Sequence, residues 1–162
     1  MAWKLTVQFR AVGTPRPGGS KTLGYSKASG RHFIRESCKK NPIWRQDVKA
    51  AAIGVLEPGT PLLDGCLRLD VLFLLPRPKG HFGTGRNAGL VKASAPPFPN
   101  VMPDTTKLLR STEDALTGIV WVDDARITDQ HAQKRYCESY APGAVITVSV
   151  WEAEELTKEK QC

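Results

Sequence analysis

The sequence has no apolar run long enough to cross a membrane and no pattern of paired cysteines. Its longest apolar run is 71–75, whereas a membrane-spanning helix needs about 20 residues. Residues 1–9 alternate apolar and polar side chains and lack the apolar stretch of a secretion signal. The four cysteines, Cys38, Cys66, Cys137 and Cys162, form no C-x-x-C pair, which argues against a zinc site or a disulfide framework. These absences favour a protein of the reducing cytoplasm.

Acidic residues are missing from two long segments of a chain whose net charge is +7. Residues 1–46 contain ten Lys and Arg but only one acid, Glu36, and residues 71–103 contain four Lys and Arg and no acid. The carboxylates gather instead at 104–129 and in the tail after Glu152. Two basic segments around an acidic cluster suit a surface that binds a polyanion around a metal site. The alternative is a basic protein whose loops are simply solvated.

Hydrophobic periodicity predicts a single domain over residues 1–152, followed by a polar tail at 153–162. Alternation over 3–10 predicts a half-buried strand, and we expect 13–30, which is rich in Gly and Pro, to be a loop. A helix is predicted over 41–56 and a buried strand over 67–75. Residues 76–103 form a long connection, which is typical of a substrate loop that orders on binding. A helix over 105–117 and strands over 126–136 and 144–151 complete an α+β fold with a mixed sheet and two main helices.

Three aspartates flank the second predicted helix. Asp104 precedes it, and Asp123 and Asp124 follow it. If the chain after Gly118 runs back along the helix, these carboxylates converge. The repulsion between carboxylates at such a site is usually offset by a bound divalent cation. Oxygen ligands favour Mg²⁺ or Mn²⁺ over zinc. The alternative is that the Asp-Asp pair only marks a turn.

A block of sequence around these aspartates resembles the RusA family of Holliday-junction resolvases. The block is Pro103-Asp104-Thr105-Thr106-Lys107-Leu108-Leu109-Arg110, followed by Asp114-Ala115-Leu116 and by Trp121-Val122-Asp123-Asp124. It is similar to the family pattern P-D-x-D-N-L-x-K, then D-A-L, then an aromatic-x-D-D turn. Lys134-Arg135-Tyr136 also resembles a strand end of the family, and the long Gly-rich loop resembles that of phage and prophage members.

The resemblance implies a Mg²⁺-dependent homodimeric endonuclease that cuts four-way DNA junctions by paired nicks, in a bacterial or phage-infected host cell; Mn²⁺ is the expected substitute metal. It implies that Asp104 and Asp124 are metal ligands, that Asp123 is their neighbour or a further ligand, and that Arg110 acts at the scissile phosphate where the family has a lysine. Asp114 is expected to be structural. For Arg110, the alternative is a surface pair with Asp114 one turn away.

Two positions depart from the family pattern, because Thr106 replaces the second motif aspartate and Lys107 replaces the asparagine. Losing one carboxylate lowers the expected metal affinity. The Thr106 hydroxyl remains able to orient a water, and Asp123 remains able to supply the missing oxygen. A non-catalytic protein that binds branched DNA therefore remains an alternative, as does a basic module that binds RNA or the ribosome.

The cations expected to contact DNA come from both basic segments and from the second predicted helix. They are Lys21, Arg77, Lys79, Arg86, Lys92 and Lys107. Salt-sensitive binding through phosphate contacts follows from this set.

Overall fold

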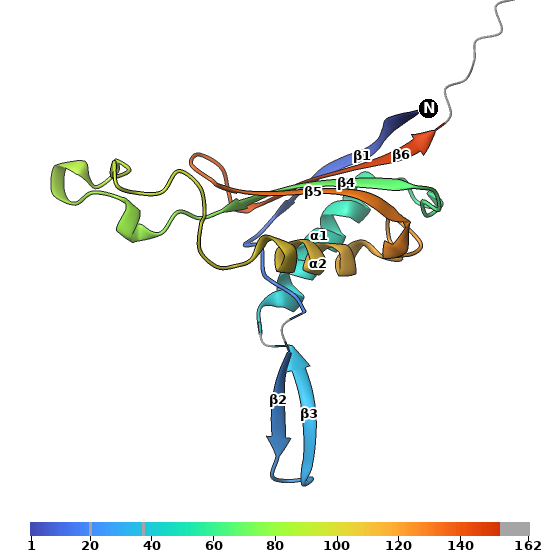
Figure 1. Ribbon diagram of the computed structural model, residues 1–162, viewed down its shortest axis with the longest axis horizontal. Coiled ribbons are helices and arrows are strands. Elements are labelled where there is room, and N and C mark those ends of the chain that lie inside the picture. The colour runs from blue at the N-terminus through green and yellow to red at the C-terminus, as the bar shows by residue number, and fades with distance from the viewer. Residues whose placement is uncertain (20, 37, 153–162) are drawn as a thin grey trace, which may run out of the picture.

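The computed structural model describes residues 1–19, 21–36 and 38–152, and the expected tail at 153–162 lies outside them. The body of the protein is built on a four-stranded sheet, and Figure 1 shows both helices on one face of this sheet and two segments that project from the body. The main elements are β1 (Ala2–Val12), β2 (Lys21–Ser26), β3 (Arg31–Glu36), α1 (Asn41–Val55), β4 (Leu67–Leu75), α2 (Thr105–Leu116), β5 (Ile127–Tyr136) and β6 (Gly143–Glu152). Three short 3₁₀ turns are η1 (Lys79–His81), η2 (Gly85–Asn87) and η3 (Asp124–Arg126).

The sheet is mixed, with the strand order β1-β6-β4-β5. β6 pairs antiparallel with β1 and with β4, whereas β5 pairs parallel with β4. A parallel pair needs a long crossover between its strands. Here the crossover is residues 76–126, which contain α2. This connection places the two ends of α2 near opposite ends of β5.

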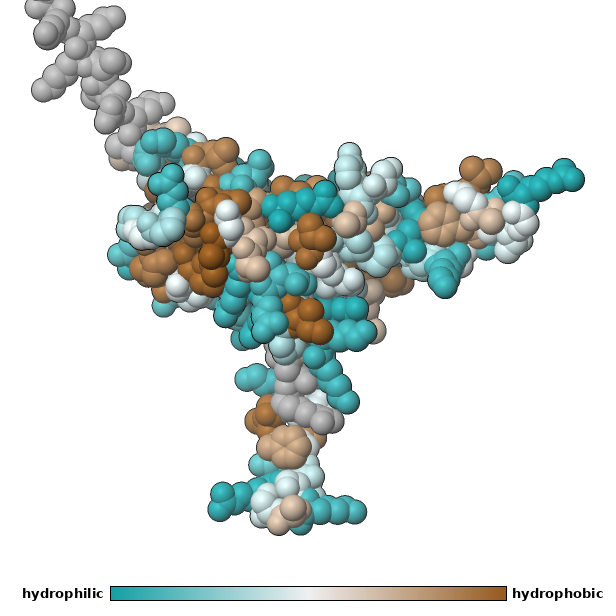
Figure 2. All heavy atoms as spheres, turned by 180° about the vertical axis from the view of Figure 1, so that it is seen from behind, coloured by the Kyte–Doolittle hydropathy of each residue, from teal (hydrophilic) through white to brown (hydrophobic). Residues whose placement is uncertain are grey.

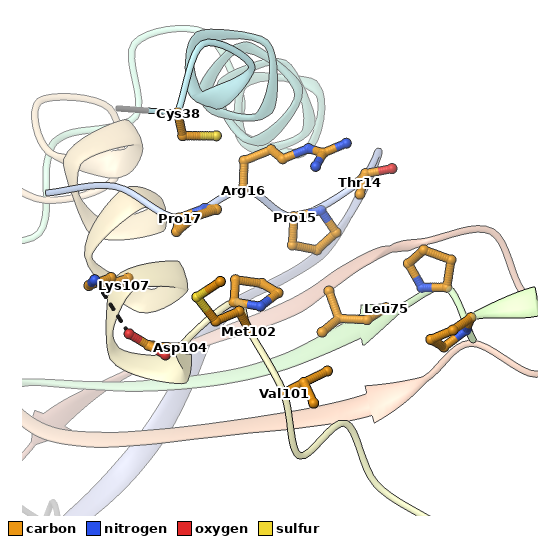
Figure 3. A pocket seen from close by; sticks show the side chains of 13 residues that line it. Thr14, Pro15, Arg16, Pro17, Cys38, Leu75, Val101, Met102, Asp104 and Lys107 are labelled. Carbon is orange, nitrogen blue, oxygen red and sulfur yellow. Dashed lines mark ion pairs between the residues drawn. The ribbon is translucent and has the colours of Figure 1, made fainter. Parts of the chain in front are cut away.

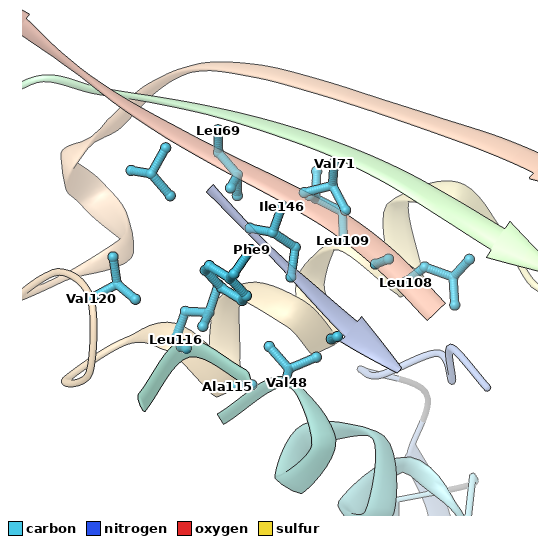
Figure 4. Packing of buried hydrophobic residues seen from close by; sticks show 14 of the residues in the cluster. Phe9, Val48, Leu69, Val71, Leu108, Leu109, Ala115, Leu116, Val120 and Ile146 are labelled. Atoms are coloured by element: carbon cyan, nitrogen blue, oxygen red, sulfur yellow. The ribbon is translucent and has the colours of Figure 1, made fainter. Parts of the chain in front are cut away.

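The core lies between the sheet and the two helices (Figure 4). Every second residue of β4 is buried, from Leu67 to Leu75, because alternate side chains of a strand face the same side. On α2 the buried apolar residues are Leu108, Leu109, Ala115 and Leu116. Their spacing puts them on one face of the helix, so the opposite face is left for polar side chains.

Six of the expected elements are confirmed, namely the strands that became β1, β4, β5 and β6 and the helices that became α1 and α2. The expected mixed α+β fold is confirmed as well. In the described part of the chain no helix is long and apolar enough to span a membrane. Cys38, Cys66 and Cys137 are free thiols.

The expectation that 13–30 is entirely loop is wrong. Residues 21–26 and 31–36 form an antiparallel hairpin that belongs to a separate two-stranded sheet. The first strand of this hairpin was not predicted because it contains Gly24, and glycine is usually depleted in strands. Here the Phe33 ring lies over it, and a Cβ at position 24 would stand 2.5 Å from Phe33 Cζ.

Candidate active site

The N-terminal end of α2 carries an aspartate that does not cap its own helix. Asp104 is the N-cap residue, yet its side chain accepts no capping hydrogen bond. Its Oδ2 lies 3.4 Å from Lys107 Nζ, and both side chains are about half exposed. The half-exposed Asp104 carboxylate therefore lies at the N-terminus of a helix, a position that favours negative charge.

A cavity of about 520 Å³ opens beside Asp104 (Figure 3). Its apolar walls include Pro15, Leu75 and Met102, and Arg16 also lines it. Asp104 and Lys107 lie together at one edge, joined by their ion pair. The cavity joins three segments that are distant in sequence: the loop after β1, the end of β4 and the start of α2.

Two anchors fix these segments. On one side, Gly18 donates from its backbone N–H to the Lys107 carbonyl at 2.9 Å, and a Cβ at position 18 would lie 3.1 Å from Ser111 Cβ. On the other side, Lys134 Nζ donates to the carbonyls of Val101 and Pro103, at 3.1 and 2.9 Å. The approach to Asp104 is therefore held from β5 as well as from the loop after β1.

The C-terminal end of α2 holds its aspartate much more tightly. Asp124 Oδ1 accepts hydrogen bonds from the Thr117 hydroxyl and, at 2.9 Å, from the indole Nε1 of Trp121. Trp121 is fully buried. The neighbouring Asp123 caps η3 by accepting from the Ala125 N–H at 2.7 Å. Asp124 is thus fixed through the core, and Asp123 has a structural bond of its own.

Glu113 joins this end of the helix, although the sequence analysis did not single it out. Its Oε1 accepts from Gln130 on β5. Burial raises the pKa of Glu113 above its ordinary value, and the negative charge of Asp124 raises it further. The sequence feature that could have identified Glu113 is its position one turn before Thr117, near the end of α2 that leads to the Asp-Asp turn.

The three predicted ligands do not meet within one chain. Asp104 is the N-cap of α2, whereas Asp124 is bonded to Thr117, its C-cap. A helix of 12 residues separates these ends by about 18 Å. β5 does run back along α2. Asp123 and Asp124, however, lie just before β5 begins, and it is Lys134, near the far end of β5, that reaches the Asp104 end of the helix. The convergence expected for the three carboxylates is therefore not found within the described residues of one chain.

Arg110 and Asp114 lie on the polar side of α2. Asp114 is bonded to Arg45 of α1, which ties the two helices together and agrees with the structural role expected for it. Arg110 is exposed. Its side chain passes close to Gly19, where a Cβ would stand 3.0 Å from Arg110 Cδ and where φ is +79°. The loop after β1 can pass Arg110 because residue 19 has no side chain.

The cations expected to contact DNA fall into two groups. Lys21, Lys79, Arg86, Lys92 and Lys107 are exposed. Of these, Lys107 pairs with Asp104, and Lys92 Nζ donates to the Gly80 carbonyl.

Arg77 does not fit this set. Its side chain is only 8% exposed and pairs with Glu138. It also bonds to the Pro96 carbonyl and lies over the Tyr136 ring, 4.0 Å from the centroid. Arg77 therefore fastens the 76–103 loop to the sheet, and its buried side chain is not available for the phosphate contact expected of it.

These features define a basic α+β protein with carboxylates at both ends of one helix, the kind of surface that acts on a polyanion. The family model for endodeoxyribonuclease RusA matches residues 9–149, which is most of the chain. The chain belongs to the RusA family. Membership implies a Holliday-junction-resolving endonuclease, a hydrolase that acts on DNA. A search of curated protein sequences found no match.

Resolvases of this family are generally dependent on a divalent metal. Within the described residues of one chain, no three His, Cys, Asp or Glu side chains gather in a way that suits such an ion. Asp104 faces a lysine, and Asp124 is already engaged with Thr117 and Trp121. The side chains of a single chain therefore do not fit the metal that the family uses.

Proposed function

We propose that the protein resolves four-way DNA junctions as a homodimeric endonuclease, with Mg²⁺ as its metal and Mn²⁺ as a substitute. The observation that supports this most is the half-exposed carboxylate of Asp104 at the N-terminal end of α2, beside the roots of two acid-poor projecting segments, in a chain of the RusA family. The basic segments supply the sequence-independent attraction to phosphates on which such binding depends. Branched DNA is the substrate that the family implies.

The separation of Asp104 from Asp124 leads to a specific form of this proposal. Carboxylates that belong to one metal site but lie at opposite ends of a 12-residue helix in one chain must be brought together by a second chain. A two-fold dimer supplies two such pairings, and two sites are what paired nicks across a junction require. In this proposal Asp104 of one protomer and Asp124 of its partner share each site.

The remaining residues have defined tasks in this arrangement. Arg110 is always protonated and offers a planar, bidentate partner to a phosphate group, which a lysine does not. Lys107 pairs with Asp104 and offsets its negative charge, a role that a divalent cation would take over if it were bound there. The Trp121 and Thr117 bonds aim one oxygen of Asp124 and leave its other oxygen for a further partner.

The test is incubation of the protein with a mobile four-way junction, with and without Mg²⁺ or Mn²⁺. We expect paired nicks in two opposing strands when metal is present, and none on a linear duplex of the same sequence. Binding of the junction without nicking, at any metal concentration, would contradict the proposal.

A second function is favoured by one observation, the exposed Thr106 in place of the motif aspartate. A site with one carboxylate fewer binds a metal ion less well. A protein that binds junctions without cutting them would need no metal ion. In that case junction affinity would not depend on Mg²⁺, and replacement of Asp104 or Asp124 would have no effect on any activity.

A further inference from the structure

The β2–β3 hairpin projects from the body as an isolated ribbon (Figure 1). Its register pairs Leu23 with Ile34 and Tyr25 with His32. Directly opposed residues lie on the same face of an antiparallel ribbon. One face of the hairpin therefore carries a continuous set of two aliphatic and two aromatic side chains.

This face is open to solvent. Leu23 and Ile34 are 66% and 68% exposed, and Tyr25 is 55% exposed. The Tyr25 and His32 rings lie 5.0 Å apart. A two-stranded ribbon without a packed face is marginally stable in water, and a contiguous exposed apolar patch on a projecting element marks an interaction site.

The charge of the hairpin indicates the chemistry of its partner. The hairpin, residues 21–36, contains Lys21, Lys27, Arg31 and Arg35 and a single acid, Glu36, at its root. Lys27 lies in the turn and Arg31 directly after it, so the tip is cationic while the middle is apolar (Figure 2). Two such tips repel each other, which disfavours a second copy of the hairpin as the partner. A polyanion with exposed apolar faces, namely DNA with unstacked bases, satisfies both features.

The root of the hairpin lies at the candidate active site. The chain enters it past Gly19, beside Arg110, and leaves it at Cys38, which lines the cavity next to Asp104. A ligand held by the hairpin is therefore continuous with one held at the N-terminal end of α2.

We propose that the hairpin is the element that recognises the branch point. The face formed by Leu23, Tyr25, His32 and Ile34 packs on bases that are unstacked where the arms meet, and Lys27 and Arg31 contact the adjoining phosphates. Apolar side chains that enter at a base step, and aromatic side chains that stack on single bases, are both established modes of DNA contact. The inference rests on the proposed function and assigns junction selectivity to one segment of the chain.

Binding is measured in EDTA, where no nicking occurs, on a four-way junction and on a linear duplex of the same sequence. The combined Leu23→Ala and Tyr25→Ala protein is expected to bind the junction at least about fivefold more weakly, since each stacked base contributes about 1–3 kcal/mol, and to bind the duplex almost as wild type. Leu90→Ala is the matched control, because Leu90 is equally exposed (63%) but lies on the other projecting segment. It should change neither affinity.

A second variant separates charge from stacking. Lys27→Gln with Arg31→Gln should weaken the binding of both DNAs and lower the log–log salt slope by about 2, at about 0.9 per lost phosphate contact. A photo-cross-link from 5-iodouracil to Tyr25 or His32 is expected with the label at the branch point and not with the label inside an arm.

Three results would overturn the inference. The first is a Leu23→Ala, Tyr25→Ala protein that keeps its preference for the junction, and the second is a cross-link only from arm positions. The third is a change of oligomeric state in this variant, seen by light scattering, which would make the hairpin a contact between copies. If the wild-type protein nicks junctions and the hairpin variants bind and prefer junctions as wild type does, the inference about the hairpin is refuted and the proposed function stands. Wild-type protein that neither prefers nor nicks junctions refutes the proposed function.

Discussion

The two ends of α2 carry carboxylates in opposite physical settings. At the N-terminal end, Asp104 is half exposed and has only a surface ion pair to Lys107, of a kind that contributes about 0–1 kcal/mol to stability. At the C-terminal end, Asp124 accepts from a buried tryptophan and from Thr117, and Glu113 is bonded to β5. One end is free to bind a ligand, whereas the other is fixed by the core. Substitutions at the two ends should therefore separate activity from stability.

The largest effect is expected from Asp104→Ala and Asp124→Ala. Each should lower junction nicking at least about 100-fold, since the loss of groups that only support a metal ligand already costs about 10–100-fold. Their stabilities should differ. Asp124→Ala leaves the buried Trp121 Nε1 without its acceptor and should cost about 1–3 kcal/mol, whereas Asp104→Ala should change stability by less than about 0.5 kcal/mol. Urea unfolding measures both, and equal losses of stability would show that the two ends are held alike.

Mixing two inactive proteins tests whether the two ends meet between chains. Asp104→Asn and Asp124→Asn homodimers should each be inactive. In the mixed dimer one shared site carries both substitutions and the other carries none, so nicking should return as single nicks. If each chain holds its own complete site, both sites of the mixed dimer are damaged, and the mixture will stay inactive after the chains have exchanged.

Thr106→Asp sharpens the comparison at the open end. A new carboxylate two residues after Asp104 should add a metal ligand and lower the Mg²⁺ concentration for half-maximal nicking by roughly threefold to tenfold, because ligand charge sets the affinity for such ions. Thr106→Asn is the control of similar polarity without the charge. A higher half-maximal Mg²⁺ concentration in the aspartate variant would mean that Thr106 is not a simple lost ligand.

The smallest effect concerns Glu113 at the fixed end. Burial, and then the charge of Asp124, raises the pKa of Glu113 in the folded protein. The folded state therefore holds this proton more tightly than the unfolded chain, and the resulting stability is lost as the pH rises through the raised pKa. Glu113→Gln cannot ionise, so the Tm of this variant should rise relative to that of wild type as the pH increases above the ordinary glutamate pKa of 4.5. The exposed Glu57→Gln is the control, and a pH-independent difference for Glu113→Gln would contradict the assignment.

Most of the fold could be predicted because its signals are local. The apolar character of 67–75 indicates a buried strand and the apolar spacing in 105–116 indicates a helix with one buried face, and both elements formed within a residue of the expected ends. The hairpin was missed because its strands do not bury a face. Its alternation carries exposed residues such as Leu23 and Tyr25, and Gly24 is explained only by the ring of Phe33 across the ribbon.

The sequence by itself determined the two helices, the four strands of the main sheet, the charge asymmetry and the residues of the family pattern, because each of these depends on residues that are neighbours along the chain. Only the tertiary structure decided which side chains meet. It placed Asp104 and Asp124 at opposite ends of a rigid helix, buried Arg77 under the loop that it fastens, and brought Glu113 beside Asp124. Such distances depend on how the crossover after β4 packs α2 against the sheet, and the spacing of residues along the chain does not contain that information.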